Sequence, residues 1–119
     1  MTVATLLRRA LVACGALYAS AGVALSAYAA HAADAGARGS LQSAALFALL
    51  HGVALAALPP QASRRTGLSA LSMLAVGTLL FSGSLVAAHA FGTPTRLAPF
   101  GGMLLIFGWL VFAIDALRR

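Results

Sequence analysis

The chain has no lysine, glutamate or asparagine, and it carries little charge of any kind. Only 8% of its 119 residues are charged, whereas 61% are hydrophobic. A soluble domain normally has about 25% charged residues, because its surface faces water. Eight arginines and two aspartates cannot cover a globule of this size, so the composition argues against a water-soluble enzyme.

Reactive groups are equally scarce. The lone cysteine, Cys14, excludes an internal disulfide and is interpreted as a small buried apolar residue. The sequence contains no nucleophile–base pattern, no glycine-rich phosphate loop and no CxxC motif. We therefore expect a protein that is not an enzyme and that carries no cofactor.

The positions of the charges predict the fold class. They leave four charge-free stretches, at residues 10–33, 39–63, 66–95 and 97–114. Each is about as long as the roughly 20 residues that cross a bilayer, and a chain in hydrocarbon must form helices to satisfy its backbone. The sequence thus predicts an all-α integral membrane protein, a single domain of residues 1–119 built as a four-helix bundle. Its predicted spans are about 10–30, 41–58, 67–90 and 99–117.

Helix-breaking residues separate these spans. A polar turn is predicted at 34–40, and Pro59 with Pro60 cannot continue a helix. Pro94 is expected to end the third span, and Pro99 lies where the fourth would start, a position that tolerates proline.

The arginines predict the orientation. Six lie before the first span, between the second and third, and after the fourth, whereas only Arg38 and Arg96 lie on the other side. The positive-inside rule therefore places both termini in the cytoplasm. The net charge of +6 is interpreted as a feature that faces lipid headgroups, because the arginines lie in pairs at span ends and not on one nucleic-acid-binding face. Membrane lipids are the expected partners, and nucleic acid is not.

A secretory signal peptide is the alternative for the first span. Arg8 and Arg9 precede an apolar run, and small residues around Tyr28 and His31 resemble a cleavage site. Cleavage would leave three spans. The run of about 20 residues exceeds the 7–15 of a signal core, which favours a retained span.

Small residues predict how the helices pack. In the first span they follow one stripe at helical spacing, namely Gly15, Ala19, Gly22, Ser26 and Ala30. Such stripes let helix backbones approach closely within a bilayer. The other predicted packing glycines are Gly77, Gly83, Gly101, Gly102 and Gly108. Tyr28 and Phe91 are expected near the membrane interface, whereas Trp109 lies deeper and is expected to fill a groove between helices.

Several segments resemble a known family. Residues 77–85 read GTLLFSGSL, which resembles the GTxLFSGSL segment of the YgdD, or transmembrane protein 256-like, family of small four-helix membrane proteins. Pro99 to Gly102, followed by Gly108 and Trp109, is similar to the last-helix signature of that family. Residues 23–31 resemble the end of its first helix, and His51 falls on its second-helix histidine. Phe47 and Ala48 replace a common Tyr-Gln pair.

This resemblance implies a location more than an activity. The family is known as domain of unknown function 423, so it implies four helices in the bacterial cytoplasmic (inner) membrane and no particular reaction. The similarity at the start of the chain also favours retention of the first span.

His31 and His89 end the first and third spans, so both are predicted at one membrane surface. With Asp34 they could form a metal site, because imidazole and carboxylate bind Zn, Cu or Fe, or the two histidines could ligate a haem. The favoured interpretation is that these histidines face water or headgroups, with no metal bound.

His51 is the candidate functional residue. It lies near the middle of the second span, where an ionisable side chain is costly and commonly functional. We expect a neutral imidazole that faces residues 78–84 across the bundle, bonded to Thr78 or Ser82. A polar site is thus predicted within the membrane, formed by His51, Thr78, Ser82 and Ser84. A proton relay or a contact to a quinone or lipid is the alternative.

The remaining charges receive ordinary interpretations. Asp115 is expected to pair with Arg119 at i+4 on the cytoplasmic surface, and Arg96 is expected to be solvated in its loop.

Three functions compete. The favoured hypothesis is a scaffold, assembly or accessory protein that binds another membrane protein or itself. The second is a small oligomeric transporter or channel, or a lipid- or quinone-binding protein, that uses His51. A redox enzyme that uses the three histidines has the least support.

Overall fold

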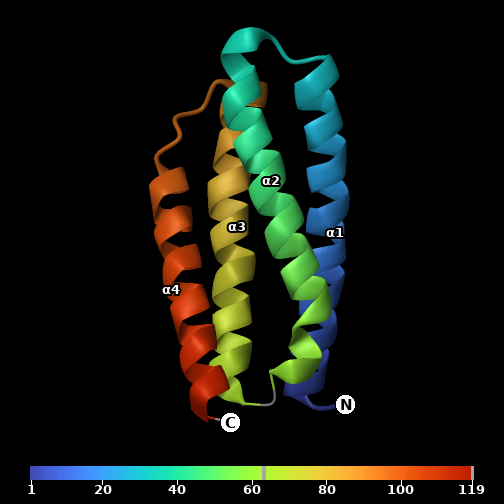
Figure 1. Ribbon diagram of the computed structural model, residues 1–119, viewed down its shortest axis with the longest axis vertical. Helices are drawn as coiled ribbons and strands as arrows, with labels where there is room; N and C mark the ends of the chain where they lie inside the picture. Colours follow the sequence, from blue (N-terminus) through green and yellow to red (C-terminus); the bar gives the residue numbers. More distant parts are fainter. Residues whose placement is uncertain (63, 119) are drawn as a thin grey trace.

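The computed structural model describes residues 1–62 and 64–118, and helices dominate them (Figure 1). The elements are α1 (Val3–His31), α2 (Ala35–Ala57), the short 3₁₀ helix η1 (Pro59–Gln61), α3 (Arg65–Phe91) and α4 (Leu97–Arg118). The four α-helices are each long and apolar enough to cross a membrane. The longest dimension, 46 Å, compares with about 40–45 Å for a bilayer with its headgroups.

All four helices begin before the predicted spans, and polar residues cap the two that extend furthest, α1 and α2. Thr2 precedes α1, and its hydroxyl accepts a hydrogen bond of 3.1 Å from the Thr5 amide. Asp34 does the same for α2, accepting from the Ala37 amide at 2.9 Å. The predicted polar turn at 34–40 is therefore wrong for most of its length, since these residues form the first turns of α2.

The other helix ends depend on glycine and proline. Gly92 ends α3 in a left-handed conformation, with φ 68°, that glycine adopts without steric cost. The helix therefore stops before Pro94, which was expected to end it. Pro59 and Pro60 lie in η1, and Pro99 is the third residue of α4 and not its first.

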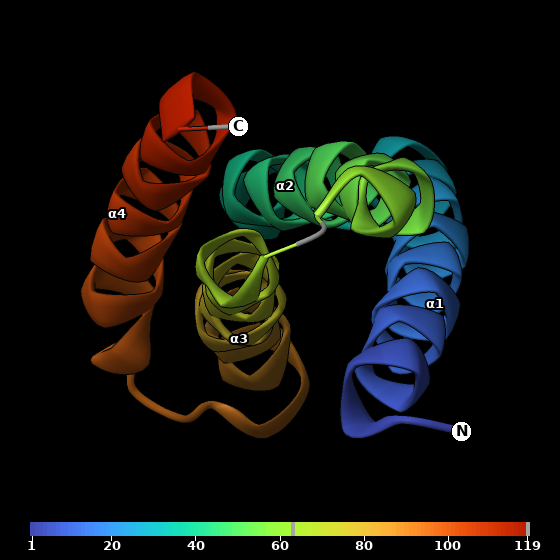
Figure 2. The same cartoon turned by 90° about the horizontal axis from the view of Figure 1, so that it is seen from below.

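The helices form two antiparallel pairs, α1 with α2 and α3 with α4 (Figures 1 and 2). The end drawn at the bottom of Figure 1, here the lower end, holds both chain termini and the α2–α3 connection. Within the described residues, α4 approaches only α3, because no Cα of α1 or α2 lies within 8 Å of it. The described helices therefore do not form a closed square bundle, because α3 lies beside α1, α2 and α4 whereas the backbone of α4 adjoins α3 alone.

Glycine brings α1 and α2 together. A Cβ atom on Gly15 would lie 2.5 Å from the Ala56 amide nitrogen, and one on Gly22 would lie 2.7 Å from that of Leu49. A Cβ atom on Gly52 of α2 would in turn meet the backbone of Ala19 on α1. These contacts leave no room for a side chain, so the two backbones touch.

Glycines also bring α3 and α4 together. A Cβ atom on Gly101 would meet the Phe81 amide, and one on Gly77 would lie 3.0 Å from the Gly101 carbonyl oxygen. A Cβ atom on Gly108 would lie 2.9 Å from the Leu74 side chain. The two pairs then share a core that includes the completely buried residues Leu55, Leu71 and Leu74, whereas Leu41 lies in a separate cluster with Ala29 and Ala33.

Two of the predicted packing glycines, Gly83 and Gly102, do not lie at helix crossings. The nearest atoms to their added Cβ atoms are ordinary side-chain contacts, at 3.6 Å and 3.9 Å. Both border hollows instead. The predicted stripe on α1 is also wrong at its upper end, where Ser26 and Ala30 are exposed and Ala29 is buried. Gly15, Gly22 and Ala29 repeat every seven residues, which fits helices that coil around one another.

Candidate functional site

His51 is buried in the lower half of α2, with 7% of its surface exposed. Its Nδ1 atom lies 2.8 Å from the carbonyl oxygen of Phe47, one turn earlier in the same helix. The indole Nε1–H of Trp109, from α4, donates to its Nε2 atom at 3.1 Å. Both ring nitrogens therefore have partners within the protein.

These two bonds determine which nitrogen of a neutral His51 ring carries the proton. An indole nitrogen can only donate, so His51 Nε2 must offer a lone pair. The proton of a neutral imidazole then lies on Nδ1, from which it is donated to Phe47. Protonation of Nε2 would remove the acceptor that Trp109 uses. The arrangement fits the neutral imidazole that was expected, with a different partner.

The serine and threonine partners predicted for His51 are wrong. Thr78 donates to the Leu74 carbonyl within its own helix at 2.7 Å, and Ser82 donates to Ala44 of α2 at 2.8 Å. Ser84 borders another hollow, together with Pro94 and Leu97. The predicted four-residue polar site does not form, because helical hydroxyls satisfy themselves on nearby carbonyls. Of the 78–84 segment, Phe81 lies beside His51.

Aromatic rings continue from His51 across three helices. Phe47 and Phe81 stack with centroids 4.5 Å apart, and the His51 and Trp109 centroids are 5.9 Å apart. The rings border a hollow of about 440 Å³ between α2 and α4, with Gly102 at its edge. Trp109, 39% exposed, thus fills a groove between two helices whose backbones do not approach, as expected. Its bond to His51 was missed, although both residues were expected at mid-span.

The three candidate metal ligands have separate roles. His89 Nε2 and the Tyr28 hydroxyl share a hydrogen bond of 2.9 Å that joins α3 to α1. Asp34 caps α2, and His31 is exposed at the end of α1. Within residues 1–62 and 64–118, no three His, Cys, Asp or Glu side chains gather as a metal site would require. The structure therefore does not bring the proposed trio together.

Asp115 differs from its predicted surface position, because it is completely buried. One carboxylate oxygen lies against Gly67 in the first turn of α3, where a Cβ atom would come within 2.7 Å of it. An acidic group is favourable beside the positive end of a helix. Arg119, its predicted partner, lies outside the described residues.

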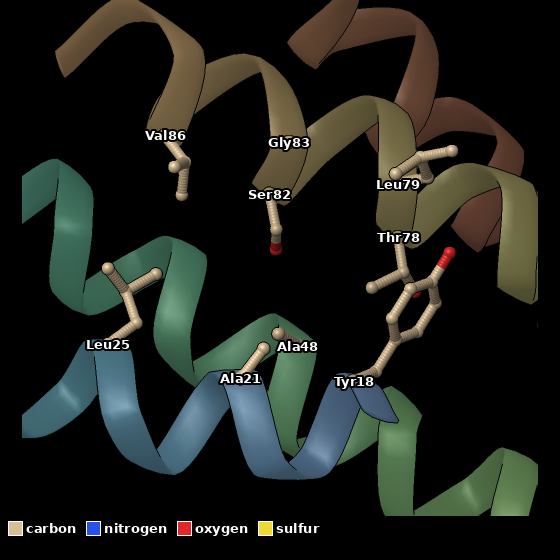
Figure 3. A pocket seen from close by; sticks show the side chains of 9 residues that line it. All are labelled: Tyr18, Ala21, Leu25, Ala48, Thr78, Leu79, Ser82, Gly83 and Val86. Carbon is tan, nitrogen blue, oxygen red and sulfur yellow. The ribbon is translucent and has the colours of Figure 1, made fainter. Parts of the chain in front are cut away.

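Tyr18 makes an interhelical contact that the sequence did not indicate. Its hydroxyl donates to the Ala75 carbonyl at 2.8 Å and so joins α1 to α3. With Thr78, Ser82 and Gly83 it lines a hollow of about 200 Å³ between α1, α2 and α3 (Figure 3). Cys14 is half-buried, and Arg96 is exposed in its loop.

Comparison with protein families shows to which family the chain belongs. A family model described as "Protein of unknown function (DUF423)" matches residues 25–102. The chain belongs to this family. The match covers the upper part of α1, all of α2 and α3, and the start of α4. The resemblance to domain of unknown function 423 is thereby confirmed. No solved structure matches the chain.

Membership of the DUF423 family does not assign a biochemical activity to the chain. His51 and the glycines at the crossings on α2 and α3 lie inside the matched segment, but Trp109 lies beyond it. Function must therefore be argued from the contacts of this chain.

Proposed function

We propose that this DUF423 protein is a non-enzymatic accessory or assembly component of the bacterial inner membrane, with both termini in the cytoplasm. The His51 imidazole and three hydroxyl groups within the helices are used for structure. His51 holds Trp109, Ser82 and Tyr18 join neighbouring helices, and Thr78 bonds within its own helix. This arrangement supports packing over a proton relay.

The proposal rests on the apolar side chains that α4 exposes. Large apolar residues recur there at alternating steps of three and four, each at least half exposed, and together form the outer stripe: Phe100, Met103, Phe107, Leu110, Ile114 and Leu117. This is the heptad spacing with which one helix packs against another. Small residues on the opposite side, such as Gly101 and Gly108, pack on α3. Since α4 approaches only α3 among the described helices, its outer stripe is free to bind a helix of another membrane protein.

Co-purification from native membranes tests this function. The wild-type protein, produced at its natural level, should retain one membrane protein in constant proportion. Phe107→Ala combined with Leu110→Ala should release it, whereas Leu17→Ala on the exposed side of α1 should not. A protein recovered without any constant partner would overturn the proposal, as would equal loss with the α1 control.

The hollow beside His51 supports a second candidate, binding of an isoprenoid quinone or similar membrane-soluble ligand. Its aromatic walls could stack on a planar ring, although both nitrogens of His51 are already occupied. Substitution Gly102→Leu should fill this hollow without a backbone clash, because an added Cβ atom would meet only Phe81 at 3.9 Å. This candidate requires a quinone that co-purifies with the wild type and is lost in Gly102→Leu but kept in Gly83→Leu.

A further inference from the structure

A second surface, along the boundary between α1 and α3, has the features of a lipid site. The two helices run in the same direction, and both begin at the lower end (Figure 1). Their backbones approach much less than those of α1 and α2. Two hydrogen bonds join them, Tyr18 to Ala75 and Tyr28 to His89. Hollows lie along this boundary, here called the α1–α3 seam.

The lower hollow combines apolar walls with a positive charge. It measures about 570 Å³ and is lined by Val3, Ala4, Leu7, Arg65, Leu68, Ser69 and Ser72. Arg65 is the first residue of α3, whose N-cap residue, Arg64, provides no side-chain cap. The Arg65 guanidinium therefore provides the positive charge at this hollow. Asp115, an acid of α4, packs on Gly67, which does not line this hollow.

The upper hollow is lined almost entirely by carbon atoms. Its hydroxyl groups come from Tyr18, Thr78 and Ser82, and each donates to a backbone carbonyl. Figure 3 shows them around a space bounded also by Leu25, Gly83 and Val86. Its volume of about 200 Å³ exceeds that of apolar cavities of roughly 150 Å³ that hold benzene. With no free polar group on these side chains, hydrocarbon suits this hollow better than a polar ligand.

We propose that one anionic phospholipid binds along the outer side of the α1–α3 seam, with its phosphate at Arg65 and an acyl chain that lies over the lower hollow and passes the Tyr18–Ala75 hydrogen bond to reach the upper one. The inference rests on the membrane placement proposed above, but not on the partner helix at α4. Guanidinium binds phosphate, and the apolar walls replace neighbouring lipid tails. The distribution of charge and carbon along the seam matches that of such a lipid.

The chain offers a matched control for each half of this site. Arg64 adjoins Arg65 but does not line the lower hollow, so Arg64→Gln removes the same charge from outside the site. Gly83 borders the upper hollow, and its added Cβ atom would meet only Leu79 at 3.6 Å, so Gly83→Leu fills space without moving a helix. Gly102→Leu is its control, because Gly102 lines the hollow beside His51.

Native mass spectrometry measures the binding. Purified protein is equilibrated with vesicles that hold equal amounts of phosphatidylglycerol and phosphatidylethanolamine with identical chains. The wild type should retain one phosphatidylglycerol. Arg65→Gln should lower this retention about fivefold, as expected for one arginine near a lipid surface, and Arg64→Gln should not. Gly83→Leu should lower retention of the lipid, and Gly102→Leu should leave it unchanged.

If either site variant behaves like its control, the proposal is overturned. Retention of both lipids in equal amounts, or displacement of phosphatidylglycerol by excess inorganic phosphate, would overturn it as well. Co-purification of a partner at α4 should be unaffected by Arg65→Gln, so failure of the lipid site and failure of the accessory function give different results.

Discussion

His51 shows how a costly residue is accommodated within the apolar interior. The sequence predicted a buried neutral imidazole, since an ionisable group at mid-span needs a partner. It did not predict which partner, because depth along a helix is readable from the sequence whereas rotation about its axis is not. Thr78 and Ser82 lie on α3 at suitable depth, but they bond to Leu74 and Ala44. Trp109 instead donates to His51 from α4, whose backbone does not approach that of α2.

The substitution Trp109→Phe tests this bond. It keeps most of the ring but removes the donor, which leaves His51 Nε2 without its partner in an apolar setting. We expect the free energy of unfolding in detergent to fall by about 1 kcal/mol. In a His51→Leu background the same change should cost much less, which a double-mutant cycle measures. Equal costs in both backgrounds would show that the bond contributes nothing.

Substitutions at Asp34 test whether this residue acts as a helix cap or as a metal ligand. Asparagine caps helices as well as aspartate does, so Asp34→Asn should leave thermal stability nearly unchanged. Asp34→Ala should lower stability by about 1 kcal/mol. Added Zn²⁺ should not raise the melting temperature of the wild type. Stabilisation by Zn²⁺ that is lost in Asp34→Asn would instead favour the metal site.

At the scale of elements, glycine determines which helices pair closely. The charge-free stretches predicted the four helices but not their ends, which depend on caps such as Asp34 and on Gly92. Small-residue spacing identified Gly15, Gly22, Gly77, Gly101 and Gly108, which lie at crossings. It could not separate them from Gly83 and Gly102, because every turn of these helices is apolar. Only contact with a partner backbone distinguishes a crossing from a hollow.

Alanine substitutions at glycine should therefore fall into two groups. Gly15→Ala, Gly52→Ala and Gly101→Ala place a Cβ atom against rigid backbone, and each should cost about 1–3 kcal/mol in unfolding free energy. Gly83→Ala and Gly102→Ala meet only side chains and should stay within about 0.5 kcal/mol of the wild type. Unfolding in detergent checks both groups. A uniform cost across all five would contradict the assignment of crossings.

For the whole molecule, the arginine distribution predicts orientation. The structure places both termini at one end, which an even number of spans requires (Figure 1). Which side of the membrane that end faces stays a prediction. Arg8 also has a local role, since its guanidinium donates two hydrogen bonds to the Ala62 carbonyl, at 2.8 and 3.1 Å. An arginine counted as a topology signal thus also joins α1 to the α2–α3 connection.

Cysteine labelling tests that orientation. In a Cys14→Ser background, Thr93→Cys should react in intact cells with a maleimide that does not cross the inner membrane. Gln61→Cys should react only after that membrane is opened, because it lies at the lower end beside Arg64 and Arg65. The reverse pattern would place the termini outside.

The position of α4 beside α3, apart from the backbones of α1 and α2, could not be read from the sequence, since hydropathy alone does not say which helices adjoin. It leaves the outer stripe of α4 as the central feature of the proposed function. Site-specific photo-crosslinking in native membranes tests it most directly, with a photoreactive residue at Phe107 on α4 or at Leu17 on α1. The account predicts a crosslink from position 107 to one distinct membrane protein, and only lipid adducts from position 17. Lipid adducts alone at both positions, or the same proteins at both, would contradict it.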